Sequence, residues 1–209
     1  MQQSLGHGLA ESAGGTPIVS LPGPRETIPW VTQYRSTWIV SGLDGLRYAG
    51  YLDRYTELLG PHRDQLLTCV AGIWLPIDVA FTHYDACERL RIPDHVYLDM
   101  VERRSQVRRA WHSAVIANVE RAETPWSVLS SVDRIWARSA DRGAVAMFQL
   151  APNQARVEYV GCKLLDIPYF RRAIRVMNQK LYERACEGLV VHELSQREPG
   201  ACSYVLHWR

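Results

Sequence analysis

The sequence predicts an α+β protein whose N-terminal helices pack on a C-terminal antiparallel sheet. In the first part of the chain, apolar residues recur three or four positions apart, which is typical of amphipathic helices. After Gly143 the spacing changes to two, the period of a strand with one buried face. The remaining roughly sixty residues then follow the order strand–strand–helix–strand–strand. Helices that precede a sheet, without strict alternation, are typical of α+β proteins and not of α/β proteins.

Residues 1–33 are interpreted as a flexible tail. Glycine and proline recur throughout this stretch, and few large apolar residues are present to offset the entropy cost of ordering it. The remaining residues, 34–209, are long enough to bury one hydrophobic core. We therefore expect a single α+β domain of the ligand-binding type behind the tail.

The helical part begins with an expected short strand at 34–40, which is rich in β-branched and aromatic residues. A helix capped by Ser41 or Asp44 is expected to run through Leu59. Further helices are expected at about 62–69, 76–90, 94–121 and 125–140.

The C-terminal unit begins with two strands, AVAMFQL and ARVEYVGC, separated by Ala-Pro-Asn-Gln, which favours a hairpin loop. A helix is expected from Pro168 to about Glu187, with Gly188 as the glycine that ends it. The last strands, LVVHEL and CSYVLHW, flank a polar turn and form a second hairpin.

Composition narrows the class of protein. The formal net charge is +2, whereas nucleic-acid-binding domains usually carry a strong basic excess, so no nucleic acid partner is expected. The five cysteines are widely spaced and never form CxxC, which favours a reducing cytoplasm over a disulfide framework. No apolar run approaches the ~20 residues of a membrane span, and the N-terminus lacks the pattern of a secretory signal.

His83 and Cys87 are the most suggestive pair, because residues four apart share one face of a helix. An imidazole and a thiolate at this spacing suit zinc or a haem-sized site. The alternative, which we favour, is that both are buried helix residues and the cysteine acts as a small hydrophobe. Trp111 and His112 on the next helix raise the same question, and half exposure is favoured for His112 over a ligand role.

Two arginine groups allow anion binding. Four arginines on the long helix form a basic band, which we interpret as a solvated face: Arg103, Arg104, Arg108 and Arg109. Arg171 and Arg172 follow the start of the last helix, where free backbone N–H groups can receive an anion. Packing of the neighbouring Tyr169 and Phe170 under the sheet, with the arginines in water, is the favoured alternative.

The sequence contains none of the signatures of common enzyme sites: GxSxG, GxGxxG, GxxxxGKS and HExxH are all missing. We therefore expect no catalytic residues.

A resemblance rests on several short stretches: VAGIWLP with HYDACERL, the helix start TPW, IPYFRR, and the closing CSYVLHW. In these the chain resembles myxobacterial paralogous proteins of unknown function that are related to the four-vinyl-reductase-like and haem-NO-binding superfamily. The resemblance implies a pocket between the helices and the sheet that holds a small hydrophobic or aromatic ligand, or a haem.

Two departures from the family bear on its cofactors. Haem-NO-binding domains carry Tyr-x-Ser-x-Arg for the haem propionates, and this sequence has no match in a suitable position. Phenol-sensing relatives bind zinc through an acidic residue and cysteines; Cys202 matches the last of these, but Ser195 stands near the position of another. The resemblance thus implies a zinc site that is lost, or rebuilt with His192, and we expect no cofactor.

Together these observations predict a non-catalytic cytoplasmic sensory module that signals to a partner protein. Five residues are expected to line its pocket for a small hydrophobic or aromatic molecule: Trp74, His83, Tyr84, Trp111 and Tyr169. Four are candidates for a metal: His83, Cys87, His192 and Cys202. The alternatives are an interaction or assembly subunit, such as a homodimer with a solid core, and a metal- or haem-dependent enzyme.

Overall fold

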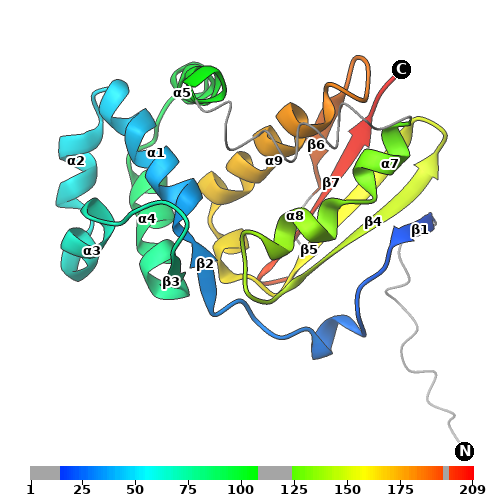
Figure 1. Ribbon diagram of the computed structural model, residues 1–209, viewed down its shortest axis with the longest axis horizontal. Helices are drawn as coiled ribbons and strands as arrows, with labels where there is room; N and C mark the ends of the chain where they lie inside the picture. The colour runs from blue at the N-terminus through cyan, green and yellow to red at the C-terminus, as the bar shows by residue number, and fades with distance from the viewer. Residues whose placement is uncertain (1–14, 108–123, 195–197) are drawn as a thin grey trace, which may run out of the picture.

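The computed structural model describes residues 15–107, 124–194 and 198–209. A five-stranded antiparallel sheet, with the strand order β1-β4-β5-β7-β6, forms one side of the molecule, and helices α1 to α5 form the other (Figure 1). Helices α7, α8 and α9 lie against the sheet, so the core is a layer between helices and strands. The predicted α+β fold is confirmed.

The C-terminal unit has the predicted order of elements. They are β4 (Ala144–Ala151), β5 (Gln154–Val160), the 3-10 helix η3 (Lys163–Asp166), α9 (Pro168–Tyr182), β6 (Val190–Glu193) and β7 (Ala201–His207). The helix α9 ends at Tyr182, before the predicted end at Glu187, because the chain turns there toward β6. The N–H of Cys186 donates to the Tyr182 carbonyl at 2.9 Å, and Gly188 takes a φ of 65°, which favours glycine.

Strand register sorts the sheet residues between two faces. Tyr159 lies opposite Cys202, and Val157 lies opposite Tyr204, so all four side chains share the face covered by α8 and α9. The alternate residues Arg156 and Glu158 point to the other face, where they form an ion pair of 2.8 Å.

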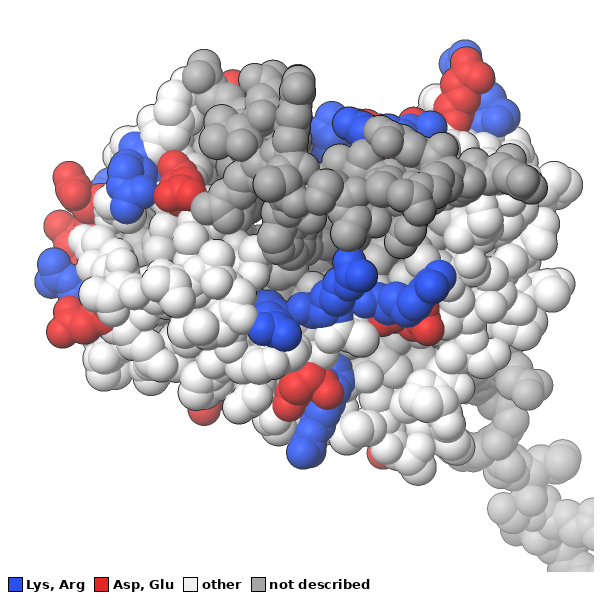
Figure 2. Space-filling view, in the orientation of Figure 1, with Lys and Arg blue, Asp and Glu red and all other residues white. Residues whose placement is uncertain are grey.

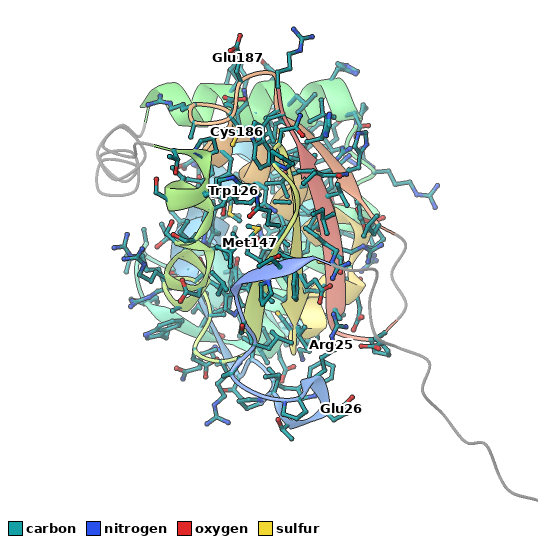
Figure 3. The ribbon with its side chains drawn as sticks, turned by 90° about the vertical axis from the view of Figure 1, so that its right-hand side faces the viewer. Arg25, Glu26, Trp126, Met147, Cys186 and Glu187 are labelled. Atoms are coloured by element: carbon teal, nitrogen blue, oxygen red, sulfur yellow. The ribbon has the colours of Figure 1, made fainter. Side chains whose placement is uncertain are left out.

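The N-terminal segment is more ordered than expected. Residues Thr16–Val19 form β1, which pairs antiparallel with β4 at the edge of the sheet, and a 3-10 helix η1 follows at Arg25–Thr27. Arg25 pairs with Glu158 on the outer face of the sheet. Figure 3 shows Arg25 at the opposite end of the molecule from Cys186 and Glu187. Residues 1–14 of the expected tail lie outside the described residues, but residues 16–33 are not a free tail, because main-chain pairing and buried side chains such as Val31 fix them.

The expected strand at 34–40 is largely wrong. The strand β2 covers only Gln33–Arg35 and pairs with β3 (Trp74–Pro76), and α1 then runs through Ser36–Tyr48. Ile39, Leu43 and Leu46 recur at helical spacing and are all buried. Burial of this stripe outweighs the strand preference of the Trp-Ile-Val run.

The other α-helices lie within the predicted regions but are shorter. They are α2 (Leu52–Glu57), α3 (Arg63–Leu67), α4 (Ile77–Arg89), α5 (Asp94–Val107), α7 (Pro125–Leu129) and α8 (Val132–Ala137), and the 3-10 helix η2 (Gly60–His62) lies between α2 and α3. The helix expected from Ser41 or Asp44 through Leu59 is wrong at its start and is divided, because both residues lie inside α1 and Gly50, with a φ of 74°, separates α1 from α2. The helix expected at 125–140 is likewise divided, into α7 and α8. Thr124 caps α7, since its hydroxyl oxygen accepts from the Ser127 N–H at 3.3 Å. The rest of the helix expected at 94–121, with Arg108, Arg109, Trp111 and His112, lies outside the described residues.

Within the described part of the chain, every helix is too short or too polar to cross a membrane. Figure 2 shows lysine and arginine side chains in a row across the middle of one face, with aspartate and glutamate beside them. Acidic side chains thus lie next to the positive charge on this face.

Candidate functional site

Aromatic rings from three elements meet between the N-terminal helices and the sheet. Tyr34 of β2, Tyr84 of α4 and Phe170 of α9 contact one another edge to face, at centroid distances of 6.1, 5.8 and 4.6 Å. Tyr169 continues this aromatic layer, 6.5 Å from Tyr84. Such contacts add about 0.5–1.5 kcal/mol each beyond the area they bury. The layer therefore fixes β2 and α4 against the start of α9.

His83, next to Tyr84 on α4, lies in a closely packed environment. Its Nδ1 shares a hydrogen bond of 2.7 Å with the Tyr55 hydroxyl, and its Nε2 lies 3.9 Å from the Cys87 sulfur. A Cβ added at Gly42 of α1 would lie 3.1 Å from the same Nε2, so glycine is needed for α1 to approach the ring. Burial raises the pKa of Tyr55 well above its usual value, so the hydroxyl keeps its proton. This geometry supports the favoured interpretation of His83 and Cys87 as packed, hydrogen-bonded helix residues.

At the other end of the aromatic layer, Tyr34 borders a small, partly open cavity between α8, α9 and the sheet. Its volume is about 20 Å³, enough for about one water molecule. The lining is mainly aromatic and aliphatic: Tyr34, Val132, Ile135, Trp136, Ser139, Tyr159, Ile174, Met177, Asn178, Leu181 and Tyr182.

Two buried polar atoms of residues that line this cavity have no hydrogen-bond partner among the described residues. They are Nδ2 of Asn178 and the hydroxyl of Tyr182, and both side chains are fully buried. The other amide atom of Asn178, Oδ1, accepts a hydrogen bond of 3.0 Å from the Tyr159 hydroxyl. Burial raises the pKa of Tyr159 and Tyr182, so both phenols stay protonated at neutral pH. Two residues of the cavity lining, Asn178 and Tyr182, thus hold a buried amide donor and a buried neutral hydroxyl without partners among the described residues.

The predicted pocket residues fall in different places. His83, Tyr84 and Tyr169 are connected through ring contacts, as part of the layer that ends at the cavity wall. Trp74 lies in β3, where the Arg35 guanidinium stacks 4.1 Å above its ring. Trp111 lies outside the described residues.

The candidate metal ligands in the last hairpin do not face each other. His192 pairs with Val205 and is exposed on the outer face of the sheet, whereas Cys202 is buried on the helix-covered face. The Cys202 thiol donates to the Tyr204 hydroxyl at 3.5 Å. Across the ranges that the structure describes, no three histidine, cysteine, aspartate or glutamate side chains gather as metal ligands. Ser195 lies outside these ranges.

The cavity residues Asn178 and Tyr182 are absent from the set predicted from sequence. Asn178 lies four positions after Ile174, on the stripe that α9 turns toward the sheet. A polar residue on an otherwise apolar helix face is a signal of a buried polar site, and it was available in the sequence.

No protein-family model and no curated protein matches this sequence. Solved structures do match. An Fe(II) unliganded H-NOX protein from K. algicida aligns with a TM-score of 0.57 and 10% identity, over 84% of this chain and 96% of that one. A mutant form of the T. tengcongensis H-NOX aligns with a TM-score of 0.54 and 15% identity, over 83% and 97%.

The chain has the fold of H-NOX domains. An oxygen-binding H-NOX domain related to soluble guanylate cyclases gives a similar match, with a TM-score of 0.53 and 14% identity over 83% of this chain and 94% of that one. At such identities the likeness is one of fold, which agrees with the haem-NO-binding-like fold expected from the sequence. Membership of the myxobacterial family stays a prediction.

Studies of H-NOX structures concern a bound haem, and the described residues of this chain do not fit that group. His83 is buried, but Tyr55, Cys87 and Gly42 surround its ring nitrogens. The cavity of about 20 Å³ is far smaller than the roughly 300 Å³ or more of a typical ligand pocket, and a porphyrin is a large ligand.

Proposed function

We propose that this chain is a non-catalytic sensory module that binds a small molecule in the cavity between α8, α9 and the sheet. One observation carries the proposal: Asn178 Nδ2 and the Tyr182 hydroxyl are buried there without partners among the described residues. Leaving such a group unsatisfied costs about 1–3 kcal/mol, which hydrogen bonds to a ligand would recover. The H-NOX fold supports this assignment, since one H-NOX domain of that fold is known as oxygen-binding.

The lining favours a neutral ligand with a hydroxyl group and an apolar or aromatic body. The described lining residues contain no charged side chain, so an ion would enter without a counter-charge. The ring of Trp136 lies 5.4 Å from that of Tyr159 and forms an aromatic wall. Because the cavity in this state holds about one water molecule, a ligand of phenol size requires the wall to open.

The wall best able to move is α8. This helix has only six residues, and its main anchor is Trp136, which packs on the sheet and donates from Nε1 to the Arg142 carbonyl at 3.0 Å. A ligand that displaces Trp136 would favour a second position of α8. Such a ligand signals by its differential affinity for the two states. The free state of all five cysteines is consistent with action in a reducing cytoplasm.

Phenol is a suitable probe, with toluene as its counterpart without a hydroxyl. Phenol should raise the melting temperature and shift the side-chain amide resonances of Asn178 in a ¹H–¹⁵N spectrum. Asn178→Leu should weaken phenol binding by about tenfold, the equivalent of about 1.4 kcal/mol. Met177→Leu, at a neighbouring lining position, is the matched control and should bind phenol as the wild type does.

Toluene, by contrast, should bind the wild type and Asn178→Leu equally. An Asn178 amide resonance that stays unchanged up to the solubility limit of phenol would overturn the use of this cavity for such ligands. Native mass spectrometry of protein purified from its source provides a test that needs no probe. Repeated failure to find a co-purifying small molecule would argue against a sensory module.

An assembly subunit is the second candidate, because the end of α3 and the loop that leads to β3 expose apolar side chains. Leu67, Val70 and Ile73 have exposed fractions of 37%, 63% and 42%. Exposed apolar clusters often mark protein contacts. A stable homodimer in light scattering that Val70→Ser dissociates, together with no ligand-dependent melting shift, would favour this candidate over the sensory one.

A further inference from the structure

A cleft opens on the surface where the C-terminal end of α4 meets the N-terminal end of α9. Its volume is about 160 Å³, close to the roughly 150 Å³ of a cavity known to accept benzene. The lining combines apolar groups with charged ones: Cys87, Glu88, Arg91, Ile92, Pro168, Tyr169 and Arg172. It shares no lining residue with the cavity between α8, α9 and the sheet.

Arg172 is held firmly at one side of this cleft. Its guanidinium carbon lies 4.4 Å from the ring centroid of Tyr97 and 5.1 Å from that of Tyr169. Its Nη1 donates to the Ile92 carbonyl at 3.2 Å and to Asp94 at 2.7 Å. A further donor, Nε, is buried and has no partner among the described residues. This N–H group of the fixed guanidinium thus lacks an acceptor.

Arg91 supplies a second cation. Among the described non-glycine residues it alone has a positive φ, of 49°, and its N–H donates to the Glu88 carbonyl at 3.0 Å to close the turn after α4. This left-handed conformation is uncommon for a residue with a side chain, and it sets Arg91 at the edge of the cleft.

Counted over its lining residues alone, the cleft has one more cation than carboxylate. Two arginines and one glutamate line the cleft, and Asp94, outside the lining, is already paired with Arg172. The α9 N-terminus adds positive potential, since Ile167 at its N-cap provides no side-chain cap. Tyr169, Pro168 and Ile92 supply flat apolar surface beside these cations.

We propose that this cleft binds a small organic anion with a planar apolar body, of the size of benzoate. The carboxylate would accept from Arg91 and from Nε of Arg172, and the ring would pack on Tyr169 and Pro168. Charge-assisted hydrogen bonds of this kind are roughly twice as strong as neutral ones. The site is independent of the cavity assigned above to a neutral ligand.

Benzoate is the probe, and benzamide is the neutral molecule of matching shape. Calorimetry or NMR titration of the full chain should show benzoate binding that weakens as salt is added, with benzamide at least tenfold weaker. Arg91→Asn should lower benzoate affinity about tenfold, because it removes the charge while asparagine still tolerates the left-handed conformation. Arg89→Asn, an exposed position that pairs with Asp85 at 3.9 Å, is the matched control and should leave affinity unchanged.

Equal affinities for benzoate and benzamide, or no loss of affinity in Arg91→Asn, would overturn the proposal. No benzoate binding to the wild type would do the same. A benzoate response that disappears in Asn178→Leu and persists in Arg91→Asn would assign the ligand to the cavity between α8, α9 and the sheet, again against this cleft. If phenol fails to bind while benzoate binds as expected, the proposed sensory function is contradicted, and the anion site in the cleft still stands.

Discussion

The hydroxyl of Tyr159 donates to Oδ1 of Asn178 at 3.0 Å, in the interior between β5 and α9. Both side chains are almost completely buried, so each depends on the other for its hydrogen bond. The bond also orients the Asn178 amide: Tyr159 occupies its acceptor oxygen, and Nδ2 is buried without a partner among the described residues.

This hydrogen bond predicts a measurable energetic coupling between Tyr159 and Asn178. Asn178→Leu should lower the free energy of unfolding by about 1–3 kcal/mol, because the Tyr159 hydroxyl then stays buried without its acceptor. Adding Tyr159→Phe removes that hydroxyl, so the double variant should be more stable than Asn178→Leu alone. Urea denaturation of the wild type, both single variants and the double variant measures the coupling. A double variant no more stable than Asn178→Leu would contradict it.

The Tyr55–His83 hydrogen bond predicts a second stability effect. Tyr55→Phe leaves Nδ1 of a buried imidazole without this partner, and the free energy of unfolding should fall by about 1–3 kcal/mol. The half-buried Tyr51 provides the control, and Tyr51→Phe should change stability by less than about 0.5 kcal/mol. Thermal and urea unfolding of the two variants should therefore differ clearly, and equal losses would refute the role given to the bond.

The buried thiols predict how stability depends on pH. Burial raises the pKa of Cys162 to about 12 and that of Cys202 to about 12, whereas an unfolded thiol titrates near 8.5. Between these values the unfolded chain has lost protons that the folded protein keeps. The free energy of unfolding should therefore fall as pH rises above about 9, by up to roughly 1.4 kcal/mol per pH unit for each thiol.

Urea denaturation at pH 8 and pH 10 measures this slope. Cys162→Ala removes one of the contributing groups, so its stability should fall less steeply than that of the wild type over the same interval. The same slope in both proteins would show that Cys162 does not contribute.

The strand β1 predicts an effect of truncation. A variant without residues 1–19 loses β1 and leaves the edge of β4 unpaired, and an open edge strand invites pairing with another chain. Such a variant should be less stable and should form larger species in light scattering. A variant without residues 1–14 keeps β1 and is the control; if both variants behave alike, β1 does not protect the edge.

The sequence predicted the C-terminal unit well because its signals are local. Alternating apolar residues, a Pro-Asn hairpin loop and a proline at the start of α9 each act within a few positions. The same local reasoning failed at 36–40, where β-branched and aromatic residues favour a strand. The apolar stripe through Ile39, Leu43 and Leu46 has a surface to pack on only in the folded protein, and its burial decides for a helix.

The candidate site, too, was predicted from the sequence only where its contacts are local. Helical spacing alone placed His83 and Cys87 on one face of α4, and the structure brings Tyr55 and Gly42, from other helices, against His83. Asn178 could be noticed from its place on the apolar stripe of α9. Its partner Tyr159 could not be known, because register and packing between β5 and α9 set that contact.

By itself, then, the sequence determined the α+β class, the order of the C-terminal elements and the helix starts at Pro125 and Pro168, which depend on neighbours along the chain. Tertiary structure alone decided three further features. It paired β1 with the sheet edge, it buried Asn178 Nδ2 and the Tyr182 hydroxyl without partners among the described residues, and it joined α4 and α9 into a cleft. Each of these depends on atoms far apart in sequence, whose contact is set by packing the whole core and not by local preference.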